Sequence, residues 1–369
     1  MKMKTLFITC GGTGGHFYPG LTIAKEFKSQ GGDVLLLLSG VNAERQAVIA
    51  RESGIEAEIL PRMPHPFKSP FKFLSGVTGG SGKSLRLFRT RRPDALLGMG
   101  SFASIPAVIG AKLTATPVFL HDGNARIGRA NRFFSRFAKL LATGYPAVNA
   151  DKTKCRTVET GMPIRQTLIE KAGLSKCEAI SELNEKFSSG LDCELPTVLV
   201  FGGSQGSLVF NRCFPEAFCN ISGIRFQVLH LTGKGKSEET LQLYREAKFP
   251  YLVLESSEDM HLFLSAADVA VCRSGGSSLA ELALFGLPAI LIPYPYAAEG
   301  HQTDNARVFS DKNAAILADM PDIDTAKAGE IISSLLNSPE KLKEMSRNMR
   351  LLAKPDASGD LLKVMDSIL

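Results

Sequence analysis

The sequence lacks tryptophan and any long apolar run, and these absences limit the class of protein. No apolar stretch reaches the ~18 residues that a membrane-spanning helix requires. The stretch Thr5–Ile8 is far too short for the apolar core of a signal peptide. The balance of 44% hydrophobic and 22% charged residues is that of a folded chain. We therefore expect a globular protein, and 369 residues are enough for two domains.

Cysteine and histidine are too scattered to indicate a metal site. The seven cysteines form no CxxC pair, and no two of the six histidines stand at zinc-ligand spacing. Asp322 and Asp324 resemble the metal-binding acid pair of some sugar transferases, but Asp324 is better explained as the N-cap of the following helix. The sequence therefore predicts seven reduced thiols in a cytoplasmic protein, with neither a metal nor a cofactor.

Acidic residues are absent between Arg62 and Arg92, a segment that carries eight basic residues. The whole chain has a net charge of +6, so its basicity is concentrated here. Phenylalanine and leucine alternate with the cations, and Gly76–Gly82 is expected to be flexible. This mixture is typical of a segment that docks on an anionic membrane. No nucleic-acid partner is expected, and GGSGKS (Gly79–Ser84) lacks the leading glycine and the strand of a phosphate loop.

Short apolar runs alternate with helix-length segments along the whole chain. Continuous runs of this kind predict parallel strands that are covered by helices on both faces, which indicates a doubly wound α/β fold. The predicted strands are residues 5–9, 34–38, 95–99, 117–120, 140–143, 197–201, 226–231, 251–254, 269–272 and 289–292.

Two distant stretches share one pattern. Ile8–Gly15 and Leu199–Gly206 both read as a strand, two glycines, a hydroxyl residue and a further glycine before a helix. A similarity at such a long spacing indicates two similar domains rather than a solenoid. We expect one domain over residues 1–163, a second over 164–345, and C-terminal helices over 346–369 that pack back on the first domain.

The first glycine loop, TCGGTGGHFYPG (Thr9–Gly20), differs from a dinucleotide-binding fingerprint. Phe17 stands where the third glycine would be, and no acid ends the next strand. Pro19 is predicted at the first helical position, which leaves Gly11–Gly15 as a backbone cradle for anions or sugar oxygens. His16 lies at the lip of this cradle, where it is either a catalytic base or a structural, exposed histidine.

Two further polar loops follow predicted strands. Gly202–Gly206 is either a second backbone cradle or a tight strand–helix turn. Ser274–Ser278 joins a strand to a helix in which Glu281 fits two roles: it could bind the vicinal hydroxyls of a ribose, or close a capping box with Ser278. With the helix that begins near Gln302, these loops predict a nucleotide crevice at the carboxyl ends of the strands.

Six stretches together resemble the N-acetylglucosaminyltransferases of glycosyltransferase family 28. In family order they are GGTGGHFYPG, GMGSFASIP, HDGNARIGRAN, GMPIR, GGSQGS and residues 272–309. The resemblance implies a GT-B fold, with two Rossmann-like doubly wound domains and the active site in the cleft between them. The chain departs from the family at Ser101-Phe102, where the family has Gly-Tyr, and at Asp122-Gly123, where it has Glu-Gln. Direct roles at 102, 122 and 123 are therefore not carried over.

The resemblance also implies a reaction and the residues that perform it. N-acetylglucosamine would pass from UDP-GlcNAc to the 4-hydroxyl of the muramoyl sugar of lipid I, with inversion, giving lipid II. His16 is the implied base. The implied donor-binding residues are Thr13, Gly14, Gly15, Asn124, Arg165, Ser204, Ser257, Gly276, Ser277, Ser278, Leu279, Ala280, Glu281 and Gln302.

The expected partners are UDP-GlcNAc, lipid I, the cytoplasmic face of an anionic membrane and other cell-wall synthesis proteins. The candidate membrane contacts are Lys68, Lys72, Arg86 and Arg89. Two other functions would use the same crevice. A non-hydrolysing UDP-GlcNAc 2-epimerase leaves the basic segment without a role, and a nucleotide-sugar-binding protein without catalysis would not depend on His16.

Overall fold

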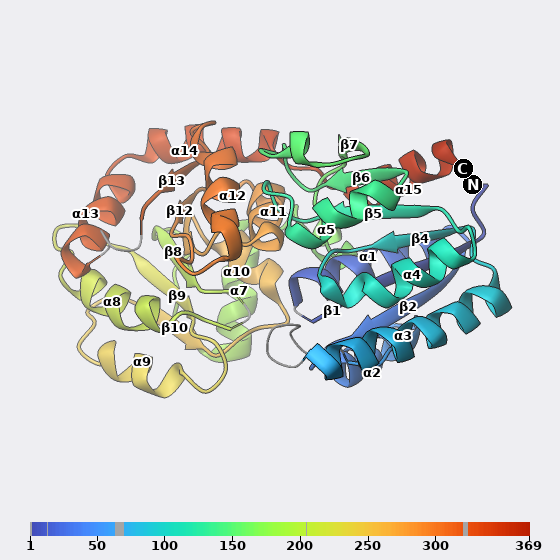
Figure 1. Cartoon of the computed structure of the whole chain (residues 1–369). Coiled ribbons are helices and arrows are strands. Elements are labelled where there is room, and N and C mark those ends of the chain that lie inside the picture. Colours follow the sequence, from blue (N-terminus) through green and yellow to red (C-terminus); the bar gives the residue numbers. More distant parts are fainter. Residues whose placement is uncertain (1, 13, 63–69, 204, 320–323) are drawn as a thin grey trace. The chain divides into compact units, whose positions relative to one another are not determined.

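The computed structural model describes residues 2–12, 14–62, 70–203, 205–319 and 324–369, without the side chains of residues 70–73. The chain divides into unit 1 (Met1–Arg165 with Lys354–Leu369) and unit 2 (Gln166–Ala353). Each unit contains one parallel β-sheet between two layers of helices (Figure 1). The predicted doubly wound α/β class is therefore confirmed. No helix in the described part of the chain has the length and hydropathy to cross a bilayer.

Unit 1 has a seven-stranded sheet in the order β3-β2-β1-β4-β5-β6-β7. Its strands are β1 (Thr5–Gly11), β2 (Asp33–Ser39), β3 (Glu56–Ile59), β4 (Ala95–Gly98), β5 (Val118–Asp122), β6 (Leu140–Thr143) and β7 (Arg156–Glu159). Its α-helices are α1 (Gly14–Ser29), α2 (Ala43–Glu52), α3 (Pro70–Arg91), α4 (Ile105–Leu113), α5 (Arg129–Phe134) and α15 (Ala357–Ile368). The short 3₁₀ helices are η1 (Phe102–Ser104), η2 (Ser135–Phe137) and η3 (Ala150–Lys152).

The two faces of the unit 1 sheet pack against different helices. Along β1, Leu6 and Ile8 face the core that includes α1, α2 and α15. The intervening Phe7 faces the core that includes α3, α4 and α5. Since side chains of a strand alternate between faces, both faces of β1 are buried, which explains its mostly apolar sequence.

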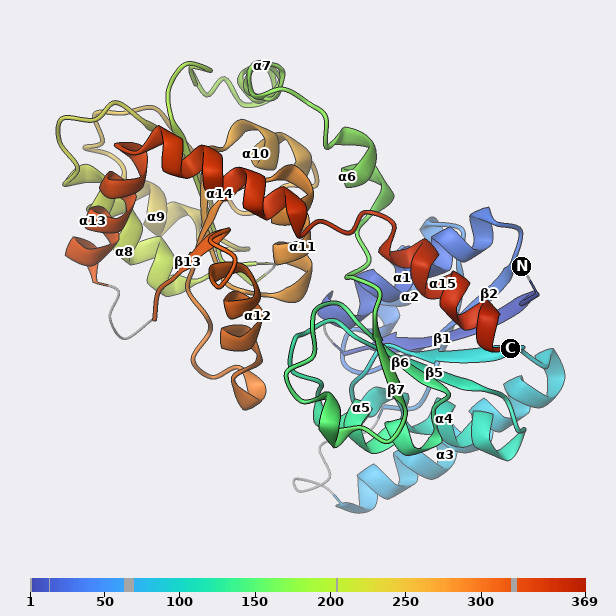
Figure 2. The ribbon, with the colours of Figure 1, turned by 90° about the horizontal axis from the view of Figure 1, so that it is seen from above.

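Helix α3 contains the glycine-rich stretch Gly76–Gly82, so the expectation that this stretch is flexible is wrong. Its glycines allow a close approach to α4, which lies alongside α3 in both views (Figures 1 and 2). A Cβ on Gly80 would be 2.9 Å from Cγ of Pro106, and one on Gly110 of α4 would be 3.0 Å from Cβ of Ser84. Close helix packing thus offsets the low helix propensity of glycine. GGSGKS lies inside this helix and is not a phosphate loop, as predicted.

The last helix of the chain, α15, packs in unit 1 beside α1 (Figure 2). Leu361 and Met365 enter the same core as α1. The backbone N–H groups of Lys2 and Met3 donate to Asp366 over 2.6 and 2.8 Å, which ties the start of the chain to its last helix. Residues Lys354–Leu369 therefore complete the fold of unit 1, whereas residues up to Ala353, including all of α14 (Pro339–Leu351), belong to unit 2.

Unit 2 has a six-stranded sheet in the order β10-β9-β8-β11-β12-β13. Its strands are β8 (Thr197–Phe201), β9 (Gln227–Leu231), β10 (Tyr251–Leu254), β11 (Val269–Cys272), β12 (Ala289–Leu291) and β13 (Ala315–Leu317). Its helices are α6 (Gln166–Lys171), α7 (Lys176–Phe187), α8 (Leu208–Cys219), α9 (Ser237–Leu243), α10 (Met260–Ala266), α11 (Gly276–Phe285), η4 (Ala298–Gly300), α12 (His301–Ser310), α13 (Thr325–Leu336) and α14 (Pro339–Leu351). Side chains of α8, α13 and α14 form one core with the sheet.

Cys177 of α7 and Cys193 form a disulfide, so the expectation of reduced thiols is wrong for this pair. Asn184 folds the intervening segment back on itself, because its Oδ1 accepts the N–H of Leu191 over 2.8 Å. This return brings the two cysteine Cα atoms to 4.9 Å, a separation that a disulfide can bridge. The 16-residue spacing carries no sequence signal for the pairing. The other five cysteines are free thiols.

Candidate active site

Polar loops gather where the strand order of each sheet reverses. In unit 1, β1 lies between β2 and β4, and in unit 2, β8 lies between β9 and β11. At such a point the connections after neighbouring strands turn to opposite faces of the sheet. The opening that they leave at the carboxyl edge is where doubly wound folds bind ligands. The two glycine loops of the sequence follow β1 and β8, so each lies at one of these openings.

His16 lies in the first turn of α1, beside the loop that follows β4. Its Nδ1 is 2.8 Å from the main-chain oxygen of Met99. Because a carbonyl oxygen only accepts, Nδ1 carries the proton and donates it, and the lone pair of the neutral ring is on Nε2. A general base needs an unprotonated nitrogen of this kind. The structure therefore gives His16 the tautomer of a base.

Helix α1 begins at Gly14, so the prediction that it begins at Pro19 is wrong. Pro19 is a buried residue of the helix interior, where it lacks the N–H of one helical hydrogen bond. The first turn consists of Gly14, Gly15 and His16, and the first N–H groups of a helix have no acceptor within it. These amides, together with the positive end of the helix dipole, suit an anion or a sugar oxygen.

The loop after β4 contains the departure from the family pattern at Ser101 and Phe102. Ser101 has φ 73°, a backbone conformation that favours glycine. Its hydroxyl accepts the N–H of Ala103 over 3.3 Å, which supports this conformation locally. The Phe102 side chain is 50% exposed. It therefore offers an apolar surface near the Met99 carbonyl that holds His16.

The loop after β5 is organised by Asp122, the other departure from the family. Its carboxylate accepts the N–H of Gly128 over 2.8 Å, the amide of Asn131 over 3.0 Å and the N–H of Asn124 over 3.2 Å. The side chain is buried and turned into its own loop. Asp122 thus positions Asn124, one of the expected donor-binding residues, through a hydrogen bond within the loop.

A second histidine of this region, His121, is buried. Its Nε2 is 3.2 Å from the main-chain oxygen of Gly161. Burial is the main reason that the pKa of His121 lies below its usual value. His121 is therefore a neutral structural group, which leaves His16 as the candidate base of this loop cluster.

Arg273 occupies the reversal point of unit 2, and the sequence analysis did not single it out. Its guanidinium donates to Oγ of Ser207 over 3.1 Å and to the main-chain oxygens of Ile292 and Pro293, also over 3.1 Å. Burial lowers the pKa of Arg273, but a guanidinium titrates so far above neutrality that it remains a cation. The sequence signal that could have identified Arg273 is a charged residue placed directly between a buried strand and a glycine turn.

Helix α11 begins at Gly276, with Gly275 as its N-cap. The capping box of Ser278 with Glu281 is therefore wrong, because Ser278 lies inside the helix and no side chain caps it. Ser277 and Ser278 contribute first-turn amides next to the buried strand end, which suits an anion. Leu279 and Ala280 are buried, so only their backbone is available to a ligand.

Gln302 connects the loops after β11 and β12. Its Oε1 accepts the N–H of Tyr294 over 2.8 Å, and its main-chain oxygen accepts the Oγ hydroxyl of Ser274 over 2.7 Å. The oxygen of the side-chain amide is thus used by the protein. The amide NH2 is the end of Gln302 that suits a sugar hydroxyl.

The remaining expected residues are divided between the units. Arg165 is the last residue of the first segment of unit 1. Ser257 lies after β10, where its Oγ accepts the N–H of Asp259 over 3.0 Å. Thr13, Ser204 and Lys68 lie outside the described residues, as does the side chain of Lys72. Asp322 also lies outside them, whereas Asp324 is confirmed as the N-cap of α13, with its Oδ1 2.8 Å from the N–H of Lys327.

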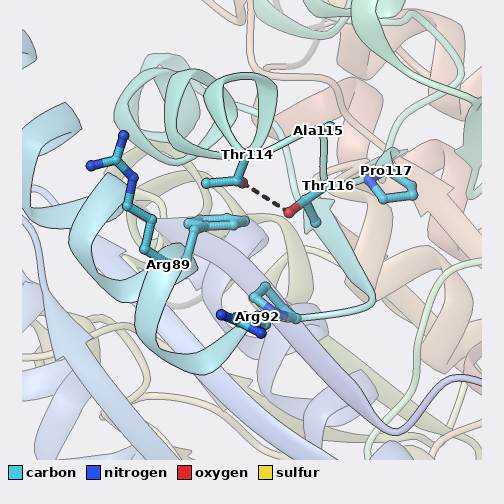
Figure 3. Close-up of a pocket in the computed structure, with 8 residues that line it drawn as sticks. Arg89, Arg92, Thr114, Ala115, Thr116 and Pro117 are labelled. Carbon is cyan, nitrogen blue, oxygen red and sulfur yellow. Dashed lines mark hydrogen bonds between the residues drawn. The ribbon is translucent and has the colours of Figure 1, made fainter.

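A separate depression lies at the opposite edge of the unit 1 sheet (Figure 3). It is lined by Arg89 and Arg92 at the end of α3 and by the segment Thr114–Pro117 before β5. The amino end of β5 begins here, whereas His16, in the first turn of α1, and Asn124, in the loop after β5, lie at the carboxyl edge. The lining contains no histidine and no acid. This depression is thus separate from the candidate active site.

Comparison with known proteins places both units in one family. Residues 6–143 match the glycosyltransferase family 28 N-terminal domain, and residues 197–361 match the family 28 C-terminal domain. The chain is 33% identical to the UDP-N-acetylglucosamine--N-acetylmuramyl-(pentapeptide) pyrophosphoryl-undecaprenol N-acetylglucosamine transferase of Hahella chejuensis, over 98% of each chain. It is 32% identical to the enzyme of the same name from Halorhodospira halophila, over 100% of this chain and 99% of the relative.

Solved structures show the same fold. The crystal structure of MurG from Acinetobacter baumannii has a TM-score of 0.79 and 24% identity, with 99% of each chain covered. The UDP-GlcNAc 2-epimerase of Neisseria meningitidis, bound to UDP-GlcNAc, has a TM-score of 0.69 and 14% identity, over 99% of this chain and 100% of the epimerase. At these identities both likenesses show the fold alone. The matched domains and the full-length relatives together show that this chain belongs to glycosyltransferase family 28.

Proposed function

We infer that this chain transfers N-acetylglucosamine from UDP-GlcNAc to the 4-hydroxyl of the muramoyl sugar of lipid I and so makes lipid II for peptidoglycan. Full-length relatives that carry the name of this reaction support the inference. Within the structure, the observation that carries it is the hydrogen bond from His16 Nδ1 to Met99, which places the lone pair of the neutral ring on Nε2. The epimerase alternative rests on the fold alone.

His16 would act as the general base. Its Nε2 takes the proton of the acceptor hydroxyl while the hydroxyl oxygen attacks the anomeric carbon of the donor. The bond from that carbon to the diphosphate breaks, its electron pair leaves with UDP, and the configuration inverts. A positioned base contributes ~10²–10⁴ in rate. The Met99 carbonyl, bonded to Nδ1–H, stabilises the imidazolium that forms.

Unit 2 would bind the leaving diphosphate. The first-turn amides of α11 at Gly276–Ser278 and the cation of Arg273 supply positive charge, and a helix N-terminus contributes ~0.3–1 kcal/mol when exposed and up to ~2 kcal/mol when partly buried. Glu281 would bind the ribose hydroxyls, and the NH2 of Gln302 a sugar hydroxyl. The remaining proposed donor contacts are Thr13, Gly14, Gly15, Asn124, Arg165, Ser204, Ser257, Leu279 and Ala280. No resident metal or cofactor is part of this proposal.

Turnover of UDP-GlcNAc with a water-soluble lipid I analogue tests the function. We expect release of UDP and formation of the disaccharide, with UDP-glucose as a poor donor. Release of UDP-ManNAc without any acceptor would instead identify an epimerase. Donor binding without either product would identify a binding protein.

Membrane docking is the second part of the proposal. It depends on the cations of α3, and two of these cations form ion pairs within the protein. Lys83 of α3 pairs with Glu58 over 2.6 Å, and Arg91 pairs with Glu56. Phe88 is buried in contact with Phe7, with ring centroids 4.9 Å apart, so it is a core residue and not a lipid contact. The described cations of the helix that remain exposed include Arg86 and Arg89.

Cations and apolar side chains continue from α3 across α4 to η2. Lys112 lies 5.7 Å from the ring centroid of Phe137, and Arg136 lies 4.5 Å from that of Phe133. Phe133, Phe137 and Leu113 are exposed. The depression in Figure 3 is lined by Arg89 and by Thr114–Pro117, the segment that directly follows Leu113. We call the whole surface the cationic face of unit 1; its members are Arg86, Arg89, Arg92, Lys112, Leu113, Phe133, Arg136 and Phe137.

The cationic face would hold the protein peripherally on the cytoplasmic side of an anionic membrane. Each cation near such a surface contributes ~1 kcal/mol, and exposed aromatic rings favour the interface. Docking there would bring the chain to its lipid-linked acceptor and to other cell-wall synthesis proteins.

A further inference from the structure

We propose that a buried hydrogen-bond relay, Tyr244–His230–Asn211, holds the glycine turn after β8, a second contact for the donor diphosphate beside the first turn of α11, with His230 as a positioning residue. The relay belongs to the donor site and therefore rests on the proposed function. It involves the part of the glycine loop from Gln205 to Ser207, and it reaches that turn from the side opposite to Arg273.

The turn rests directly on the main chain that follows β9. A Cβ on Gly206 would be 1.9 Å from the oxygen of Thr232, and one on Gly233 would be 2.7 Å from the oxygen of Gln205. Backbone therefore lies on backbone, with no side chain between the two segments. A displacement of the Thr232 carbonyl is transmitted to Gly206 because nothing compressible separates them.

The Thr232 carbonyl is held by Asn211, whose Nδ2 donates to it over 3.0 Å. Oδ1 of the same amide is 3.2 Å from Nε2 of His230, and Nδ1 of His230 is 3.0 Å from the hydroxyl of Tyr244. Because a carbonyl only accepts, the direction of each bond is fixed. Tyr244 O–H donates to His230 Nδ1, and His230 Nε2–H donates to Asn211 Oδ1.

Burial keeps the relay in this one state. Tyr244 and His230 are 0% exposed and Asn211 is 4% exposed. Burial lowers the pKa of His230 to about 3 and raises that of Tyr244 well above its usual value. Both groups therefore stay neutral at physiological pH, and no substrate reaches them.

The cost of burying three polar side chains argues for a role beyond packing. Apolar side chains of similar size would fill the space without desolvation, whereas a buried polar network is stable only when all its members are bonded. Asn211 also lies one turn after Ser207, whose main-chain oxygen accepts its N–H over 2.9 Å. The relay thus fixes the start of α8 and the Thr232 carbonyl at the same time.

Two variants of one residue test the relay, because each amide replaces one ring nitrogen. In His230→Gln the amide nitrogen takes the position of Nε2 and keeps the donor to Asn211. In His230→Asn the amide takes the position of Nδ1 and keeps only the bond to Tyr244. Affinities of the full-length chain for UDP and for uridine are measured by calorimetry, with the melting temperature of each variant alongside.

We expect His230→Asn to weaken the binding of UDP about tenfold and the binding of uridine less than about twofold. This is the effect of one lost buried hydrogen bond. His230→Gln should stay within about threefold of wild type for both ligands. Equal losses of affinity for UDP and for uridine, or equal losses of UDP affinity in the two variants, would overturn the relay. If a histidine variant does not fold, Tyr244→Phe replaces it: a UDP-selective loss supports the relay, and unchanged UDP affinity overturns it.

The same measurement separates this inference from the proposed function. A wild-type chain that binds UDP no more tightly than uridine has no diphosphate site at this turn. That result would refute the donor site itself, whatever the variants do.

Discussion

The two glycine loops have nearly the same sequence pattern and the same place in their sheets, but they present different chemistry. Gly15-His16 of the first loop corresponds to Gly206-Ser207 of the second. In unit 1 the helix has already begun at Gly14, so His16 lies in its first turn. In unit 2 the helix begins at Leu208 and Ser207 is its N-cap. One pattern therefore presents the imidazole of the candidate base in unit 1 and a hydroxyl bonded to a cation in unit 2.

Exposure to solvent also differs between a histidine of unit 1, His16, and a histidine of unit 2, His230. His16 is partly exposed and its Nδ1 is bonded to the Met99 carbonyl, so the lone pair of the neutral ring lies on Nε2. His230 is fully buried and bonded at both nitrogens. The two proposed roles, a base for His16 and a positioning group for His230, follow from this difference in burial and hydrogen bonding.

The largest effect is expected from removing the base of unit 1. His16→Ala should lower kcat by ~10²–10⁴, the usual contribution of a general base, while the KM for UDP-GlcNAc changes only a few fold. His16→Asn is the matched control, because its amide can keep the bond to Met99 but cannot accept the proton, and it should be as impaired as His16→Ala. Steady-state kinetics with a soluble acceptor measure both. A variant that retained most of its turnover would remove His16 as the base.

The second prediction compares the surfaces of the units. Reversing Arg86, Arg89, Lys112 and Arg136 to glutamate should strongly weaken binding to anionic vesicles, since each cation contributes ~1 kcal/mol. Extending the reversal to Lys68 and Lys72 should add to the loss. Vesicle sedimentation measures it, and wild-type binding should weaken with salt.

A matched reversal on unit 2 is the control. Arg225, Lys248, Lys312 and Lys341 are exposed there, and their reversal gives the same change in net charge. Vesicle binding should persist in this variant, and both variants should glycosylate a short-chain, water-soluble acceptor. Vesicle binding that survived both the unit 1 reversal and high salt would rule out the cationic face as the docking surface.

The third prediction concerns the disulfide, which only unit 2 contains among the described residues. A cross-link that closes a loop of about this length stabilises by ~3 kcal/mol, because it restricts the unfolded chain. Reductant, or Cys177→Ser with Cys193→Ser, should therefore speed hydrogen exchange in α7 while α1 of unit 1 is unaffected. Exchange in α7 that is the same with and without reductant would contradict the pairing.

The smallest effect is expected at Glu281. Glu281→Ala should weaken UDP-GlcNAc binding by ~1–3 kcal/mol through loss of a charged acceptor, measured by calorimetry. Because Ser278 is not an N-cap, neither Glu281→Ala nor the control Ser278→Ala should lower the melting temperature through a lost capping box. A lower melting temperature with unchanged donor affinity would favour a purely structural role for Glu281.

The apolar runs predicted all the central strands and one outer strand, β10, and the three strands that they missed are all outer strands. β3 (EAEI) and β7 (RTVE) are the two outer strands of unit 1, and each is partly exposed. β13 is the outer strand of unit 2 and has three residues. A strand shows a continuous apolar run only when both of its faces are buried. Edge strands meet this condition incompletely, so their sequences carry a weak signal.

The sequence by itself determined the fold class, the two glycine loops and the family resemblance, because apolar runs and glycine positions are local properties of the chain. Only the tertiary structure decided the first residue of α1, the pairing of Cys177 with Cys193 and the partners of Arg273. It also decided which nitrogen of His16 carries the proton, since Met99 is 83 residues away in the sequence. These features depend on groups that meet only after the chain has folded, and no local pattern encodes such a meeting.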